Sequence, residues 1–105
     1  MTEITQTRNG SRVRVSMHGH ALVNPGNDPV CAALSALAYT MIRWLEKKEE
    51  DGKIKDLVID IDDGHVVVSF SDTKKVWAGG WEVLSTGFEL IADSYSDNVR
   101  LRERT

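Results

Sequence analysis

The chain has 105 residues, of which 41% are hydrophobic and 28% are charged, and its formal net charge is −3 at pH 7. This length and balance predict one folded domain, residues 1–105, with room for a modest hydrophobic core. The acidic balance argues against direct binding of nucleic acid, which calls for a basic face. Because Cys31 is the only cysteine, an internal disulfide is excluded and the fold does not depend on an oxidising compartment.

The sequence also lacks signals for a membrane or for export. No apolar run approaches the roughly 18 residues of a membrane-spanning helix. The opening segment MTEITQTRNG has no apolar stretch of the kind found in secretory signal peptides. These features predict a cytoplasmic protein without a membrane partner.

The first predicted element is a β-hairpin over residues 2–18. Apolar residues such as Val13 and Val15 alternate with polar ones, which is the pattern of a half-buried strand. Asn9-Gly10 supplies a turn signal between the two strands.

A long amphipathic helix is predicted to begin at Pro29. Asp is a preferred N-cap residue and Pro suits the first helical position, so Asp28-Pro29 is a start signal. Apolar residues then recur at three- and four-residue spacing and form one buried stripe, made of Val30, Leu34, Leu37, Met41 and Leu45. The charged run EKKEEDGK, with Gly52, is expected to end the helix.

A second hairpin, a second helix and a final strand follow. Residues 57–61 and 66–70 alternate between apolar and polar around the turn signal Asp62-Asp63-Gly64. Gly79-Gly80 is expected to break the chain before a helix in WEVLSTGFELIADSYS. The core face of that helix is assigned to Leu84, Phe88, Ile91 and Tyr95. The closing segment NVRLRER is predicted to pair at a sheet edge.

The predicted order is ββαββα(β), which defines a two-layer α+β fold. Two helices are expected to pack on one face of a small mixed or antiparallel sheet. Trp77 and Trp81 flank the glycine pair in WAGGW. Packing at the edge of the core is favoured for both indoles over a place in a peptide groove or a dimer contact.

The position of Cys31 raises the question of function. With Asp28 as the N-cap, the thiol lies in the first helical turn, where unpaired backbone N–H groups and the positive end of the helix dipole favour a thiolate. A thiolate is a nucleophile for covalent catalysis, and His20 at the end of the second strand could meet it as a base. The alternative is a small core residue among Ala, Leu and Val. Local chemistry leaves both interpretations open.

Neighbouring polar residues admit further interpretations. Asp28 as a plain helix cap is favoured over Asp28 as a third catalytic group, and Ser35 lies one turn after Cys31 on the same helical face. A zinc site formed by His18, His20 and Cys31 is a weaker alternative, because no second ligand cluster supports it. His65, directly after the Asp-Asp-Gly turn, is predicted to be simply exposed.

These residues also carry a family resemblance. GHA at 19–21 and DPVCAALSAL at 28–37 resemble the signature of the ribosomal-processing cysteine proteases (Prp). In that family Gly-His-Ala and a glycine-containing loop precede Asp-x-Val-Cys-Ala, with a serine one helical turn later. The segment LSTGFELIADSYSDNVRLRE is similar to the closing helix and edge strand of the family. The similarity extends from about Ile4 to Arg102.

The resemblance implies a cysteine endopeptidase with Cys31 as nucleophile and His20 as general base. Asp28 and Ser35 would be supporting residues. On physical grounds, backbone N–H groups at the helix start are natural candidates for the oxyanion hole. The implied substrate is the N-terminal extension of a large-subunit bacterial ribosomal protein, and the implied assembly is a homodimer without metal or cofactor. The loop expected to order around the peptide comprises Ala21, Leu22, Val23, Asn24, Pro25, Gly26 and Asn27.

Two prolines depart from the family pattern. Pro29 stands where the family usually has an aliphatic residue, and Pro25 stiffens the loop. A stiffer loop could change how a substrate fits without altering Cys31 or His20. A second hypothesis is a non-catalytic, ribosome-associated protein that keeps the scaffold and binds a basic ribosomal protein or peptide, for which the mild acidity is suited.

Overall fold

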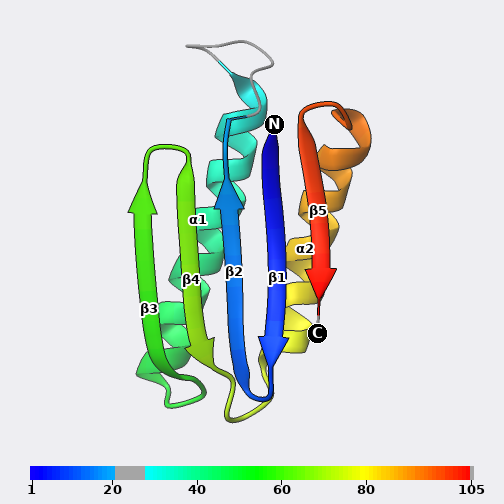
Figure 1. Cartoon of the computed structure of the whole chain (residues 1–105). Coiled ribbons are helices and arrows are strands. Elements are labelled where there is room, and N and C mark those ends of the chain that lie inside the picture. The colour runs from blue at the N-terminus through cyan, green and yellow to red at the C-terminus, as the bar shows by residue number, and fades with distance from the viewer. Residues whose placement is uncertain (21–27, 105) are drawn as a thin grey trace.

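The computed structural model describes residues 1–20 and 28–104, which form one five-stranded sheet and two helices. Both helices, α1 (Pro29–Glu50) and α2 (Trp77–Ser94), cover the same face of the sheet (Figure 1). The strand order is β3-β4-β2-β1-β5, with bounds β1 Thr2–Asn9, β2 Arg12–His18, β3 Lys55–Asp62, β4 His65–Ser71 and β5 Val99–Arg104. The predicted α+β fold and its element order are confirmed. Neither described helix has the length and apolar composition needed to cross a bilayer.

The two hairpins join in the middle of the sheet. β2 pairs antiparallel with β4 in a register that sets His18 opposite His65, while β1 pairs with β5 in parallel, so the sheet is mixed. This register brings the end of β2 beside the β3–β4 turn, and a backbone hydrogen bond of 2.9 Å from Gly19 to Gly64 joins them. The predicted final edge strand is therefore present, next to β1.

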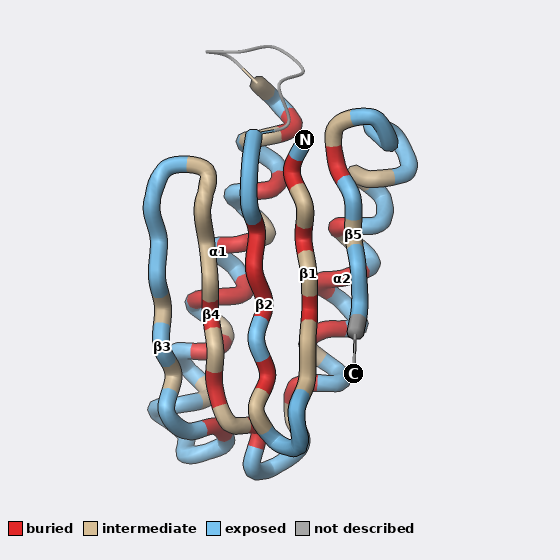
Figure 2. The backbone as a smooth tube through the Cα atoms, in the orientation of Figure 1, coloured by how far each residue is buried: buried red, intermediate tan, exposed pale blue. Residues whose placement is uncertain are grey.

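The core lies between the sheet and the helices. The helix-facing side of the central strands carries fully buried residues, which include Ile4, Val13, Val15, Val68 and Phe70. Figure 2 shows buried segments repeating along β1, β2 and β4 and along the facing sides of both helices. On the other sheet face, Arg14 and His18 are exposed, while Ser16 between them is buried.

Helix α1 begins and ends as its sequence predicts. The Asp28 carboxylate accepts hydrogen bonds from the backbone N–H groups of Val30 and Cys31, at 2.8 and 3.2 Å. Pro29 occupies the first turn, where its missing N–H costs nothing. The helix ends at Glu50, and Gly52 follows with a φ of +72°.

Helix α2 begins earlier than predicted, at Trp77, and contains Gly79 and Gly80. The glycine pair does not break the helix because Gly80 serves helix packing: a Cβ there would lie 2.8 Å from the Trp44 ring of α1. The other end also differs, since Tyr95 is the C-cap and is exposed rather than part of the core.

The start of α2 is capped from a distance. The Asp72 carboxylate accepts hydrogen bonds from the N–H groups of Val76 and Trp77 and pairs with Arg8 at 2.9 Å. Trp77 is 1% exposed and its indole donates to Gln6 at 3.0 Å, while Trp81 is also buried. Core packing of both tryptophans, the favoured prediction, is confirmed.

Candidate active site

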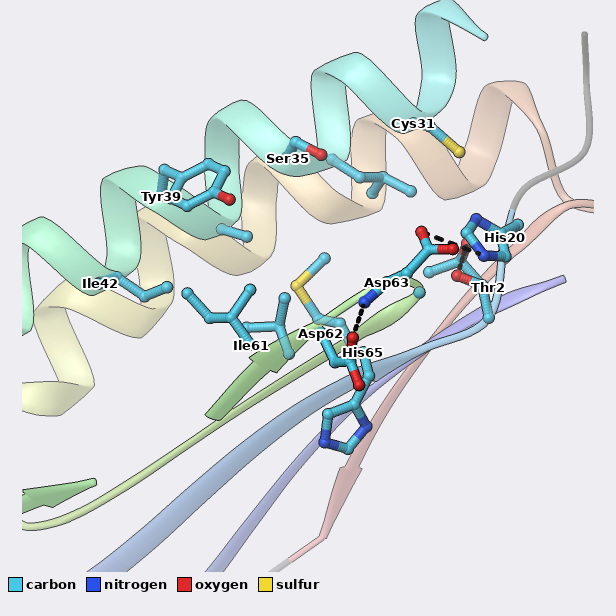
Figure 3. A pocket seen from close by; sticks show the side chains of 16 residues that line it. Thr2, His20, Cys31, Ser35, Tyr39, Ile42, Ile61, Asp62, Asp63 and His65 are labelled. Atoms are coloured by element: carbon cyan, nitrogen blue, oxygen red, sulfur yellow. Dashed lines mark hydrogen bonds and ion pairs between the residues drawn. The ribbon is translucent and has the colours of Figure 1, made fainter. Parts of the chain in front are cut away.

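An open groove of about 470 Å³ lies between α1 and the edge formed by the end of β2 and the β3–β4 turn. Cys31 and Ser35 line it from α1, and His20 lines it from the residues that follow β2 (Figure 3). Its apolar lining comes from both layers and includes Met17, Leu34, Ala38, Tyr39, Ile42, Ile61 and Val66. The fold thus brings the candidate nucleophile and the candidate base to one cavity.

Cys31 is both packed and accessible. Its neighbours Val30 and Leu34 are buried, and Cys31 itself is half-buried against the core while its sulfur points into the groove. Among the described residues, the hydrogen-bond partner of the thiol is Asp28, whose Oδ2 lies 3.5 Å from Sγ. The same carboxylate therefore caps the helix through Oδ1 and holds the thiol through Oδ2.

His20 is fixed through its backbone. The N-terminal amino group donates to the His20 carbonyl at 2.7 Å, and Thr2 Oγ1 donates to the carbonyl of Gly19 at 3.4 Å. The imidazole is half exposed, and its Nε2 lies 3.8 Å from Asp63 Oδ1. The ring faces the groove across from Cys31 (Figure 3). In enzymes without bound substrate, the hydrogen bond between a base and its partner is often long, and it shortens when substrate binds.

The helix start differs from the expectation for an oxyanion hole. The N–H groups of Val30 and Cys31 are engaged by the Asp28 side chain, and that of Ala32 donates to the Asp28 carbonyl at 3.1 Å. Pro29 has no N–H to offer. A capping carboxylate satisfies the amides that the sequence had suggested as donors, so they are not available in this arrangement.

The comparison with protein families assigns the chain to a family. A family model described as cysteine protease Prp matches residues 1–100. The chain belongs to the Prp family of cysteine proteases. The predicted resemblance is confirmed, and Cys31 is the only cysteine in the sequence.

Solved structures agree with membership of the Prp family. The essential ribosomal processing protease Prp from S. aureus, in complex with a covalently linked product peptide, is 27% identical, with a TM-score of 0.77 over 98% of this chain and 99% of that one. The same enzyme with a substrate peptide gives 23% identity and a TM-score of 0.70 over 98% and 99%. A protein from Streptococcus mutans gives 22% and 0.69 over 100% and 99%. A search of curated proteins gives no match.

The three residues of the alternative zinc site do not form one cluster in this Prp fold. His18 contacts His65, with the two Nδ1 atoms 3.0 Å apart, and His65 Nε2 lies 3.2 Å from Asp60. His20 and Cys31 instead line the groove. The described residues hold no group of three His, Cys, Asp or Glu side chains suited to a metal ion. The prediction that His65 is simply exposed is wrong, because 33% of its side chain is exposed and both ring nitrogens have partners.

Two groove residues were not identified as site residues from the Prp-like sequence, Asp63 and Gly64. Both were read as turn residues, and their contact with His20 follows from the pairing of β2 with β4. No local pattern encodes that pairing; only a prediction of the sheet register could have found it. The predicted substrate loop, residues 21–27, lies outside the described residues.

Proposed function

We propose that this protein is a cysteine endopeptidase in which Cys31 is the nucleophile and His20 the general base. The observation that carries the proposal is that both side chains line one groove in a chain of the Prp family. Asp28 is proposed to hold the thiol and to fix the helix turn that carries it, and Ser35 to line the groove beside it.

The proposed reaction has two stages. His20 takes the proton of the Cys31 thiol, and the sulfur attacks the scissile carbonyl carbon to form a tetrahedral intermediate. As the C–N bond breaks, His20 returns the proton to the leaving amine and an acyl-enzyme remains. Water, activated by the same imidazole, then cleaves the thioester and restores the thiol.

We propose the N-terminal extension of a large-subunit ribosomal protein as the substrate. Support comes from the similar S. aureus structure, which is described as a ribosomal processing protease and holds a covalently linked product peptide. The apolar lining of the groove, with Leu34, Ile42 and Ile61, suits an extended peptide that carries apolar side chains. A homodimer and a cytoplasmic location, which the family resemblance and the sequence predict, complete the proposal.

The test is cleavage of a peptide that spans the end of that extension, followed by mass spectrometry. Cys31→Ala is expected to abolish cleavage because no other thiol is present in the sequence. His20→Ala is expected to lower kcat by about 10²–10⁴-fold, the usual contribution of a general base. His18→Ala is the matched control, because His18 contacts His65 outside the proposed dyad, and it should cleave normally.

Two results would overturn the proposal. Cleavage by Cys31→Ala at the wild-type rate would remove the nucleophile. Tight binding of the peptide by the wild type without any cleavage would instead support a non-catalytic binding protein.

A further inference from the structure

The β3–β4 turn forms the wall behind His20. The carbonyl of Gly64 accepts the hydrogen bond from Gly19 N–H at 2.9 Å, so the turn is tied to the residue directly before the histidine. The turn is itself stiffened, since Asp62 Oδ1 accepts from the N–H of Asp63 at 2.8 Å. The His20 imidazole therefore lies against the β3–β4 turn, whose position is fixed by these hydrogen bonds.

Gly64 provides the space in which the ring lies. A Cβ at this position would come within 2.6 Å of His20 Nε2 and within 3.2 Å of both neighbouring ring carbons. The ring thus occupies the place that a side chain at residue 64 would take. Gly64 also has a φ of +64°, a conformation that other residues adopt at a cost.

Asp63 supplies a charge beside the same nitrogen. Its Oδ1 lies 3.8 Å from His20 Nε2, although its side chain is 94% exposed. An ion pair this exposed is worth little in water. A peptide lying in the groove would exclude water from this edge, and the interaction of Asp63 with a protonated imidazole would then strengthen.

We propose that the β3–β4 turn positions His20 for catalysis, with Gly64 as the surface against which the ring packs and Asp63 as its charged partner at Nε2. This inference rests on the proposed role of His20 as general base. With Nε2 turned to Asp63, Nδ1 is the nitrogen left to take the thiol proton. Asp63 and Gly64 are positioning residues, since they act through His20.

The rate at which iodoacetamide alkylates Cys31 at low salt tests the role of the Asp63 charge, and the assay requires no peptide substrate. Asp63→Asn should slow alkylation about threefold, in line with an exposed pair, and the difference should vanish in 1 M salt. Asp63→Glu should restore the rate, and Asp60→Asn, which makes the same charge change beside His65, should leave it unaltered. Removal of a negative charge that acted on the thiol directly would speed alkylation instead, and that result would overturn the proposal.

Making Asp63→Asn both in the wild type and in the His20→Ala variant distinguishes this inference from the proposed function. In His20→Ala, the further change Asp63→Asn should no longer slow alkylation. Should His20→Ala leave peptide cleavage at the wild-type rate, the proposed function fails. Should His20→Ala impair cleavage while Asp63→Asn leaves alkylation unchanged, only the role of Asp63 fails.

A pair of glycine variants tests the ring position. Gly64→Ala is expected to slow alkylation about tenfold, because a displaced base loses its alignment with the thiol. Gly10→Ala is the matched control: Gly10 also lies in a hairpin turn, with a φ of +62°, but a Cβ there would meet nothing within 4 Å. Both variants should lower the unfolding temperature similarly, while only Gly64→Ala should affect the thiol. Equal alkylation rates in the two variants would contradict the proposal.

Discussion

An aspartate carboxylate caps the start of each helix, but the two helix starts differ in their surroundings. Asp28 caps α1 from the adjacent position and also contacts the Cys31 thiol at the mouth of an open groove. Asp72 caps α2 from a position several residues earlier, and its side chain is 2% exposed and paired with Arg8. The same hydrogen-bonding chemistry thus occurs at an open helix start beside the groove and at a sealed one inside the core.

What surrounds each start makes the difference. Behind Asp72, the first turn of α2 places Trp77 between the Phe70 and Trp81 rings, at centroid distances of 5.0 and 5.5 Å. Beside Asp28, the sheet contributes the end of β2 and the β3–β4 turn, and within residues 1–20 and 28–104 the groove stays open. The buried start supports the fold, and the open one presents the Cys31 thiol to the groove.

Substitution of Asp72 tests the sealed start and should have the largest effect on stability. Asp72→Ala leaves Arg8 without its partner and the N–H groups of Val76 and Trp77 without their acceptor. We expect the free energy of unfolding to fall by about 3 kcal/mol, as when one partner of a largely buried ion pair is removed. Urea unfolding measures the loss. Asp72→Asn keeps an acceptor and should lose less, and a loss under about 1 kcal/mol in the alanine variant would contradict a structural role.

Substitution of Gly80 tests how closely the sealed start packs on α1. Gly80→Ala would place a Cβ 2.8 Å from the Trp44 ring, and we expect a loss of about 2 kcal/mol from overpacking. Gly79→Ala, one residue earlier and with nothing within 4 Å, should instead gain up to about 0.5–1 kcal/mol from helix propensity. Thermal unfolding of the two variants should therefore shift in opposite directions, and a rise in the unfolding temperature of both would mean that Trp44 moves aside.

Substitution of Asp28 tests the open start and should have the smallest effect on stability. Asp28→Ala removes the cap and is expected to cost about 1 kcal/mol. Asp28→Asn retains a good capping group and should unfold within a few tenths of a kcal/mol of the wild type. If Asp28→Asn nevertheless impairs peptide cleavage, the carboxylate acts on the groove and not only on the helix. A fully active Asp28→Asn would limit Asp28 to capping.

The two starts also mark how far the sequence could predict the structure. Asp28-Pro29 lies directly before its helix, and the start of α1 was predicted correctly because the capping signal is local. The cap of α2 comes from Asp72 across a turn, and Gly79-Gly80 resembles a helix break unless the Trp44 ring is known to lie beside it. Helix propensity alone cannot predict the contact between Gly80 and the Trp44 ring of the other helix.

The candidate site shows the same limit. Cys31, His20, Ser35 and Asp28 were singled out from one motif, and the structure places all four at or beside one groove. Asp63 and Gly64 were not, because they reach His20 only through the pairing of β2 with β4. The helix amides named as candidate oxyanion donors are occupied here for a local reason, since the predicted cap itself accepts their hydrogen bonds.

The parallel pairing of β1 with β5 has a consequence for the newly made chain. During synthesis β1 and β2 emerge first, but the outer edge of β1 stays open until Val99–Arg104 have followed. An open edge strand is a template for pairing with other chains, so the nascent protein is most exposed to misassembly during that interval. Once β5 is in place, Val99 is 2% exposed and the Glu103 side chain accepts a hydrogen bond from the Trp81 indole. β5 thus covers the edge of β1 within this sheet.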